Sequence, residues 1–157
     1  MDHAMKVDLD AGYWLTATHR CTQCRHEAPV TVLVVTEGCE HWNGVMWSID
    51  QPSFVIDVGC ELPLEVVRQR WLLNPNLGMP TVGERTVSDL ANVCQHCGTR
   101  IEDDDLVEPG GPFLPSNPAS AVLVSCTPLE QPFTANEAEV WEEDALPGLL
   151  QRFSQRD

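Results

Sequence analysis

Short segments rich in apolar residues run through the N-terminal third of the chain, a pattern typical of β-strands. Residues 13–18 and 28–36 are predicted to be two strands that pair as a hairpin. The second is β-branched and almost entirely apolar, which indicates a strand covered on both faces. After a turn over 38–44, residues 45–49 and 53–58 are predicted to be two more strands of the same antiparallel sheet.

Residues 62–73 change to a helical period. Leu64, Val67 and Trp71 recur at the spacing of one helix face, and Pro63 suits a first helical turn. We therefore predict a helix here. Beyond a loop rich in helix breakers, residues 86–93 are predicted to be extended.

The last third of the chain is predicted to hold one strand and two short helices. The strand covers 121–126 and the first helix covers 136–143. The second helix starts around Pro147, with Asp144 as a candidate cap. Its apolar stripe consists of Leu146, Leu149, Leu150 and Phe153.

Prolines recur at every third residue between the extended and C-terminal segments, at 109, 112, 115 and 118. This spacing is compatible with a polyproline II ligand for an aromatic groove. Phe113 and Leu114 lie among the prolines, and they favour an extended loop that packs on the core.

Two C-x-x-C pairs carry the strongest chemical signal, Cys21 with Cys24 and Cys94 with Cys97. Four thiolates in two such turns form a closed tetrahedral set suited to zinc. With every coordination position filled by protein, the ion would organise the fold and would not activate a water molecule. We therefore predict one structural Zn²⁺.

The two pairs lie unusually far apart. A zinc ribbon separates its pairs by roughly 15–20 residues, whereas residues 25–93 lie between Cys24 and Cys94 here. A thioredoxin-type redox role for Cys94 and Cys97 would need a helix start within a βαβ pattern, and Gly98 follows instead. A zinc deaminase would need H-x-E and P-C-x-x-C, which the chain lacks.

The residues around both pairs resemble a split zinc-ribbon module of small bacterial proteins. Residues 92–98, 103–106 and 108–113 are similar to its second half, and residues 21–35 are similar to its first half. The chain departs from the module at Arg25, where a small residue is usual, and at Glu102, where glycine is usual. The resemblance implies a metal-bound fold and no particular reaction.

These elements together predict an α+β fold, a β-rich split zinc ribbon with an antiparallel sheet and peripheral helices. We expect one domain over residues 1–157. The ribbon halves lie around 13–36 and 87–115, with an insertion at 37–86. An acidic segment of strand and helices, 119–157, completes the domain.

The charge of the chain indicates which classes of partner to expect. The net charge is -15, and residues 101–157 alone hold 12 acidic and 2 basic side chains. Such a field repels phosphate backbones and attracts basic proteins, so a nucleic-acid partner is disfavoured. No signal peptide or membrane-length apolar run is present, and seven cysteines without an export signal suit a reducing compartment, where thiols bind metal or stay free. We expect a cytoplasmic protein without a membrane partner.

The predicted helix over 136–143 is the candidate partner surface. Its residues are Glu137, Glu139, Trp141, Glu142 and Glu143. The same pattern also fits a solvated helix face. We expect a non-catalytic binding protein, of the inhibitor, immunity or adaptor kind, that recognises a basic partner. The alternative is a thiol oxidoreductase or another enzyme that uses a C-x-x-C pair.

The other cysteines and histidines carry weaker signals. Cys126 ends an apolar strand and is expected to be buried. Cys39 and His41 form a C-x-H pair that would hold a second metal only with Cys60 nearby. His19, His26 and His96 flank the cysteine pairs, where each could act as a ligand or contact one. No catalytic motif is present, and the oligomeric state is left open.

Overall fold

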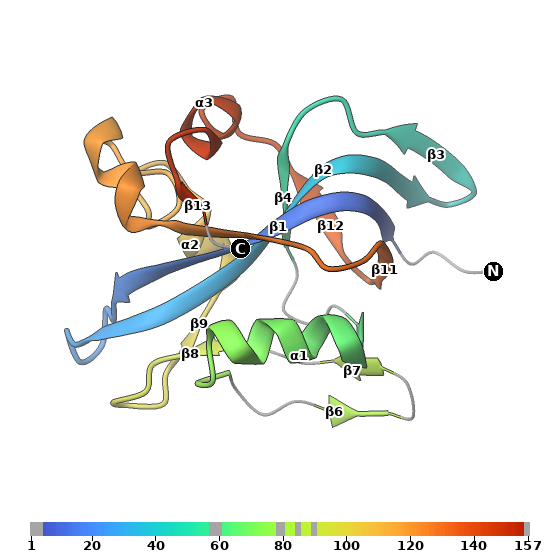
Figure 1. Ribbon diagram of the computed structural model, residues 1–157. Coiled ribbons are helices and arrows are strands. Elements are labelled where there is room, and N and C mark those ends of the chain that lie inside the picture. Colours follow the sequence, from blue (N-terminus) through green and yellow to red (C-terminus); the bar gives the residue numbers. More distant parts are fainter. Residues whose placement is uncertain (1–4, 57–60, 78–80, 84–85, 89–90, 156–157) are drawn as a thin grey trace.

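The computed structural model describes residues 5–56, 61–77, 81–83, 86–88 and 91–155. It is a mixed α+β fold whose main sheet is mostly antiparallel, as predicted. Two long strands, β1 (Lys6–Arg20) and β2 (Glu27–Trp42), pair along their whole length and form the central hairpin (Figure 1). All other elements are arranged around this hairpin.

The main sheet continues on both sides of the hairpin in the order β12-β4-β2-β1-β10-β13. In addition, β3 pairs with β2 and β11 pairs with β1. Only the β10–β13 pair is parallel among the strand pairs described. The bounds of these strands are β3 Val45–Ser48, β4 Ser53–Ile56, β10 Ser125–Pro128, β11 Phe133–Asn136, β12 Glu139–Trp141 and β13 Ser154–Gln155.

Among the described residues, two small sheets and four helical segments complete the fold. One small sheet contains β5 (Leu62–Pro63), β6 (Thr81–Val82) and β7 (Thr86–Ser88), and the other contains β8 (Asn92–Val93) and β9 (Arg100–Ile101). The helical segments are α1 (Leu64–Leu73), α2 (Asp103–Leu106), the 3₁₀ helix η1 (Pro118–Leu123) and α3 (Leu146–Leu150). No helix in the described part of the chain is long and apolar enough to cross a membrane.

Each face of the main sheet covers its own core. On one face α1 contributes Val66 and Val67 to a cluster with Trp14 and Leu33. The other face is covered by α3, η1 and the loop that contains Phe113. Both faces of β2 are therefore buried at its centre, as its apolar sequence predicts.

A double β-bulge divides the hairpin into two halves. The pairing register shows one extra residue in β1, Asp10, and one in β2, Thr36. Because side chains alternate between faces, each extra residue moves the rest of its strand to the opposite face. Val7 and Leu9 thereby join Trp14 in the same core, although their positions differ in parity.

A buried polar network fixes the strand that leads into the second cysteine pair. The Asn92 side-chain oxygen accepts a hydrogen bond from the Thr31 N–H (2.9 Å), and its NH₂ group donates to the Thr31 carbonyl (2.8 Å). Arg70 Nε donates to the Thr31 hydroxyl (2.9 Å), and its guanidinium lies over the Trp14 ring at 5.1 Å. Asn92 thus satisfies the edge of β2 as a neighbouring strand would.

Several predicted elements are confirmed. The hairpin, β3 and α1 form where expected, and β4 covers 53–56, the described part of its predicted range. Helix α3 has Pro147 in its first turn and buries Leu146, Leu149 and Leu150, and Phe153 of the predicted stripe is buried beyond the end of the helix. The proline-rich loop packs on the core through Phe113 and Leu114, as predicted. Residues 89 and 90 of the predicted 86–93 segment lie outside the described residues.

The largest correction concerns the predicted helix at 136–143. These residues form the end of β11, a turn at Glu137 (φ 58°) and strand β12. Long-range pairing of β12 with β4 determines this structure. In a helix, Glu139 and Glu143 would also have lain side by side on successive turns, where their like charges repel.

Other predictions were wrong in detail. Residues 118–123 form η1, capped by the Asn117 side chain, so the strand predicted at 121–126 starts only at Ser125. Strand β2 continues through the turn predicted at 38–44 and reverses tightly at Asn43–Gly44, both with positive φ. The N-cap of α3 is Ala145 and not Asp144.

Two further expectations fail on packing. Leu64 and Trp71 of the predicted α1 face are exposed and only Val67 of that face is buried; the helix also buries Val66, Gln69 and Arg70. The proline-rich loop is not extended, because backbone hydrogen bonds link Gly110 with Leu114 and Leu114 with Gly111. Polyproline II structure contains no such bonds.

Replacing Asn92 with alanine tests the buried network. Asn92→Ala leaves the Thr31 N–H buried without this partner and weakens the bonding of the Thr31 carbonyl. We expect a loss of about 2–4 kcal/mol in the free energy of unfolding, measured with urea. The control Asn76→Ala removes a solvent-exposed hydrogen bond to Gln95, and we expect it to cost less than about 1 kcal/mol. Equal losses in both variants would contradict this role of Asn92.

Candidate metal centre

The first cysteine pair lies in the turn that joins β1 and β2. The Cys21 N–H donates to the His26 carbonyl (2.9 Å), and the Arg25 N–H donates to the Cys21 carbonyl (2.9 Å). These two bonds form a compact loop, which we call the first knuckle (residues 21–26). Cys21 is buried, and Cys24 is partly exposed.

The second pair lies in a matching loop between β8 and β9, the second knuckle (residues 94–99). The Cys94 N–H donates to the Thr99 carbonyl (2.9 Å), and the Gly98 N–H donates to the Cys94 carbonyl (2.8 Å). The hydrogen-bond pattern therefore repeats that of the first knuckle residue by residue. Gly98 has φ 75°, and its counterpart Arg25 has φ 67°. The departure of Arg25 from the ribbon pattern thus places a non-glycine residue in a left-handed conformation.

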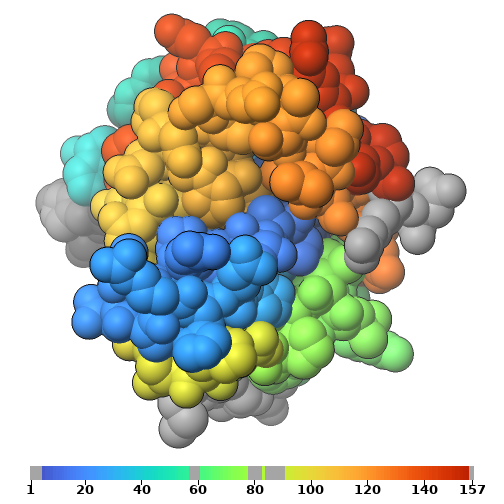
Figure 2. Space-filling model, turned by 90° about the vertical axis from the view of Figure 1, so that its left-hand side faces the viewer, coloured from blue at the N-terminus to red at the C-terminus, as the bar shows by residue number. Residues whose placement is uncertain are grey.

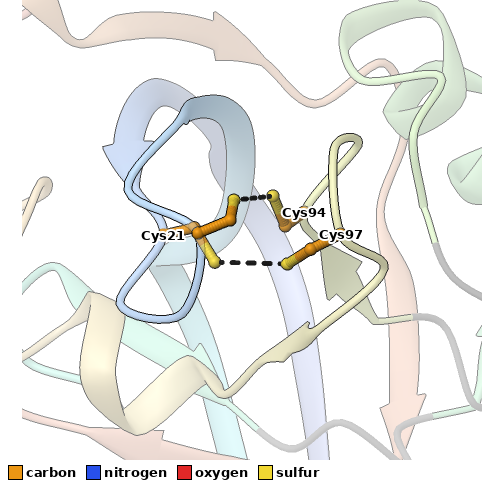
Figure 3. A group of neighbouring side chains, drawn as sticks. Cys21, Cys94 and Cys97 are labelled. Atoms are coloured by element: carbon orange, nitrogen blue, oxygen red, sulfur yellow. Dashed lines mark hydrogen bonds between the residues drawn. The ribbon is translucent and has the colours of Figure 1, made fainter.

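The four sulfur atoms converge between the knuckles (Figure 3). Cys21 Sγ lies 3.6 Å from Cys97 Sγ, and Cys24 Sγ lies 3.5 Å from Cys94 Sγ. All four lie within 4.8 Å of one another. Zinc–sulfur bonds of about 2.3 Å in a tetrahedron place the sulfurs roughly 3.8 Å apart. The arrangement thus matches a four-thiolate metal site and is too wide for disulfides.

The electrostatics of the cluster favour a bound cation. Hydrogen bonding with the Thr99 hydroxyl and amide lowers the pKa of Cys97 to about 6. The pKa of Cys24 is raised to about 12, because a backbone hydrogen bond at His26 that lowers it is outweighed by burial and the neighbouring thiols. The four sulfurs cannot all carry negative charge at this distance unless a positive ion lies between them.

The histidines near the knuckles do not belong to this cluster. His26 and His96 stack on each other, with ring centroids 4.4 Å apart, and so join the two knuckles by direct contact. His19 lines an open hollow of ≈ 770 Å³ between the hairpin end and the loop that follows α2. Burial lowers the pKa of His19, and Asp105 partly offsets this effect.

The hairpin end lies between two segments that are remote in sequence (Figure 2). The yellow second knuckle borders it on one side, and the gold and orange segment containing α2 and η1 borders it on the other. Cys21 and Cys94 belong to the same core as Phe113 and Leu114. A metal ion here would connect the hairpin to the part of the chain that follows α1.

The arrangement leaves little support for redox chemistry at Cys94 and Cys97. Strand β9 follows this pair, whereas a thioredoxin-type site has the pair at the start of a helix. The close sulfur contacts also run between the knuckles and not within a pair. Four protein ligands would leave a bound ion no open position.

The predicted partner residues lie on and around β12. Glu137, Glu139, Trp141 and Glu142 are exposed, and Trp141 Nε1 donates to Glu143 Oε1 (2.9 Å). Sequence reasoning missed Glu40 on β2, whose pKa is raised by burial and then by the nearby charges of Glu142 and Glu139. Only the long-range pairing of β12 through β4 to β2 brings these acids together.

The three cysteines outside the four-cysteine cluster lie in different environments or outside the described residues. Cys126 is fully buried, as predicted, and burial raises its pKa to about 11. Cys39 and His41 lie at the opposite end of the hairpin from the knuckles, where Asp8 joins them. Cys60, the third ligand that the C-x-H hypothesis required, lies outside the described residues.

The two knuckle positions with positive φ allow a matched test. Arg25→Gly should raise the free energy of unfolding by roughly 0.5–1 kcal/mol, because glycine adopts this conformation without a Cβ penalty. Gly98→Ala should lower it by about 1 kcal/mol. A Cβ at Gly98 would meet no atom within 4 Å, so the expected cost is conformational. Urea denaturation measures both changes, and a loss of stability in Arg25→Gly would contradict the shared geometry.

Removing one sulfur should reveal whether a metal organises the fold. Protein purified without added metal and washed with a mild chelator should retain about one zinc per chain by elemental analysis. Cys97→Ser should lose that zinc and unfold far more easily, whereas Cys126→Ser should keep it at an ordinary core cost of about 1–3 kcal/mol. Equal losses of stability with unchanged zinc would show that the four-cysteine cluster is not the organiser.

Comparisons of this chain with protein-family models, with curated proteins and with solved structures found no match. The resemblance to the split zinc-ribbon module therefore rests on the cysteine pairs and the matching geometry of their knuckles.

Proposed function

We propose that the chain is a non-catalytic binding protein whose fold is held by a structural zinc ion at Cys21, Cys24, Cys94 and Cys97. The convergence of four sulfurs from two matching knuckles supports the metal. Zinc suits this set because thiolate ligands and a tetrahedral arrangement are its usual combination in structural sites. Such an ion would stabilise the fold and take no part in catalysis.

The binding surface that we infer is the acidic strand segment, residues 137–143, together with Glu40. The observation that carries it is the strand order β12-β4-β2, which groups Glu139 and Glu142 with Glu40. Burial raises the Glu40 pKa, and the charges of Glu142 and Glu139 raise it further. Exposed tryptophans lie beside these acids: Trp141 on β12, and Trp47 opposite Glu40 on β3. Tryptophan is enriched in protein interfaces and is a common hot-spot residue there.

A basic protein is the partner that this chemistry fits. The charges of Glu142 and Glu139 disfavour ionisation of Glu40, and lysine or arginine side chains that approach would offset this effect. An inhibitor or immunity-type protein that covers a basic partner would use such a surface, and so would an adaptor. Phosphate backbones would be repelled by the same field.

Charge and tryptophan should affect different rate constants. With the partner captured from the native host, Glu139→Lys with Glu142→Lys should mainly lower the association rate, because charges steer encounter. Trp141→Ala should raise the dissociation rate and weaken binding by about 2 kcal/mol or more if the ring is a central anchor. Surface plasmon resonance at increasing salt measures both constants.

The matched control places the same charge change elsewhere. Glu108→Lys with Glu130→Lys alters two exposed acids outside the segment, and we expect a much smaller change in the association rate. Binding that responds to neither salt nor Trp141→Ala, or equally to both charge pairs, would rule out the acidic strand segment as the binding surface.

A further inference from the structure

A second group of metal-ligating side chains lies at the end of the hairpin remote from the knuckles. Asp8 of β1 is paired with Cys39 of β2, and His41 lies two residues beyond Cys39. Residues at this spacing share one face of a strand. Asp8 and His41 remain about one-third exposed, with side-chain accessibilities of 37% and 35%. Solvent ions can therefore reach the group.

Three ligand atoms of this group face one another. His41 Nε2 lies 2.6 Å from Asp8 Oδ2 and 3.3 Å from Cys39 Sγ, and Cys39 Sγ lies 3.5 Å from Asp8 Oδ2. One nitrogen, one sulfur and one oxygen thus form a small triangle that opens toward solvent. It is the second of the two groups of this kind found among the described residues.

The triangle does not fit a thiol nucleophile. In a Cys-His-Asp triad the imidazole contacts the nucleophile through one ring nitrogen and the carboxylate through the other. Here the same atom, Nε2, faces both Cys39 and Asp8. Convergence on one point is instead the arrangement of ligands around an ion.

We propose that Asp8, Cys39 and His41 bind a second zinc ion, with a water molecule in its fourth position. Tetrahedral zinc with ordinary bond lengths places sulfur roughly 3.6 Å from the other two ligand atoms, and nitrogen roughly 3.3 Å from oxygen. Both sulfur distances already lie within 0.3 Å of that value. Only the hydrogen-bonded pair of Asp8 and His41 would have to move apart.

A supporting hydrogen bond already orients the carboxylate. The Thr134 hydroxyl of β11 donates to Asp8 Oδ1 (2.6 Å), which leaves Oδ2 to face Cys39 and His41. Carboxylates that bind metals are commonly held in this way by a group behind them. Sequence reasoning missed Asp8 and Thr134, because only the pairing of β11 with β1 brings Thr134 next to Asp8.

The fourth position would face an open hollow of ≈ 610 Å³. Lys6, Trp42, Asn43 and Asn136 line this hollow beside Asp8 and His41. Three protein ligands and one exchangeable water distinguish such a site from the closed four-cysteine cluster. An ion here would exchange with solvent and could accept an oxygen or nitrogen donor from a small ligand.

Cobalt can report this site in the full-length protein. With the four-cysteine cluster filled by zinc and excess metal removed, Co²⁺ should bind at one further equivalent and give tetrahedral visible bands and a thiolate-to-cobalt band in the near ultraviolet. Zinc released during the titration, measured in the same sample, shows any exchange at the four-cysteine cluster. We expect no such release at one equivalent.

Three variants assign the bands. Cys39→Ser should lose the thiolate-to-cobalt band, and Thr134→Val should weaken cobalt binding by roughly 10–100-fold while the band remains. Cys126→Ser, which removes a buried thiol outside both groups, should behave as the wild type. A thiolate band that persists in Cys39→Ser, or one that vanishes in Cys126→Ser, would overturn the assignment.

Chemical labelling gives a second readout that does not depend on cobalt. Added zinc should protect Cys39 from iodoacetamide in the wild type, as followed by peptide mass spectrometry, and this protection should be lost in Asp8→Ala. Circular dichroism checks that the variants stay folded. No cobalt band and no protection of Cys39 in the wild type would show that Asp8 and His41 form an ion pair only, and the proposal would be wrong.

Discussion

Four thiol groups within 4.8 Å of one another impose the strongest constraint on this structure. They cannot all ionise without a cation, because like charges at this distance repel one another. A bound ion would remove the repulsion and join the hairpin end to a turn more than 60 residues away in sequence. Because the loop so closed is long, much of the stabilisation would come from the restriction of the unfolded chain.

Contacts other than the metal also hold the two knuckles together. Asn92 lies two residues before Cys94, and its amide bonds both backbone groups of Thr31 in the strand that leaves the first knuckle. The stacked rings of His26 and His96 add a second contact. Burying Arg70 and the asparagines costs desolvation, which their hydrogen bonds offset. Such a network contributes less to total stability than to specifying one relative position of the knuckles.

Features set by short-range pattern could be predicted from the sequence, and features set by long-range pairing could not. The cysteine pairs, the hairpin, α1 and the stripe of α3 all follow from spacing along the chain. Val7 and Leu9 alternate with polar residues, which is a strand pattern, but the first half of β1 was not predicted because Asp8 and Asp10 make this segment acidic. By contrast, β12 adopts its conformation because β4 lies beside it, and no local period in 136–143 indicates that partner. The same reason explains why Asp8 could not be connected with Cys39 and His41.

The two ends of the β1–β2 hairpin differ because of the double bulge between them. Without the extra residues Asp10 and Thr36, strict alternation would have turned Asp8, Cys39 and His41 toward the core beneath the sheet, where an ionised carboxylate is costly. An extra residue in only one of the two strands would have placed Asp8 and Cys39 on opposite faces of the sheet. Paired insertions keep the two residues opposite each other and turn both toward solvent, while Val7 and Leu9 enter the core. The same double bulge therefore buries Val7 and Leu9 and leaves the triangle of ligand atoms open to water.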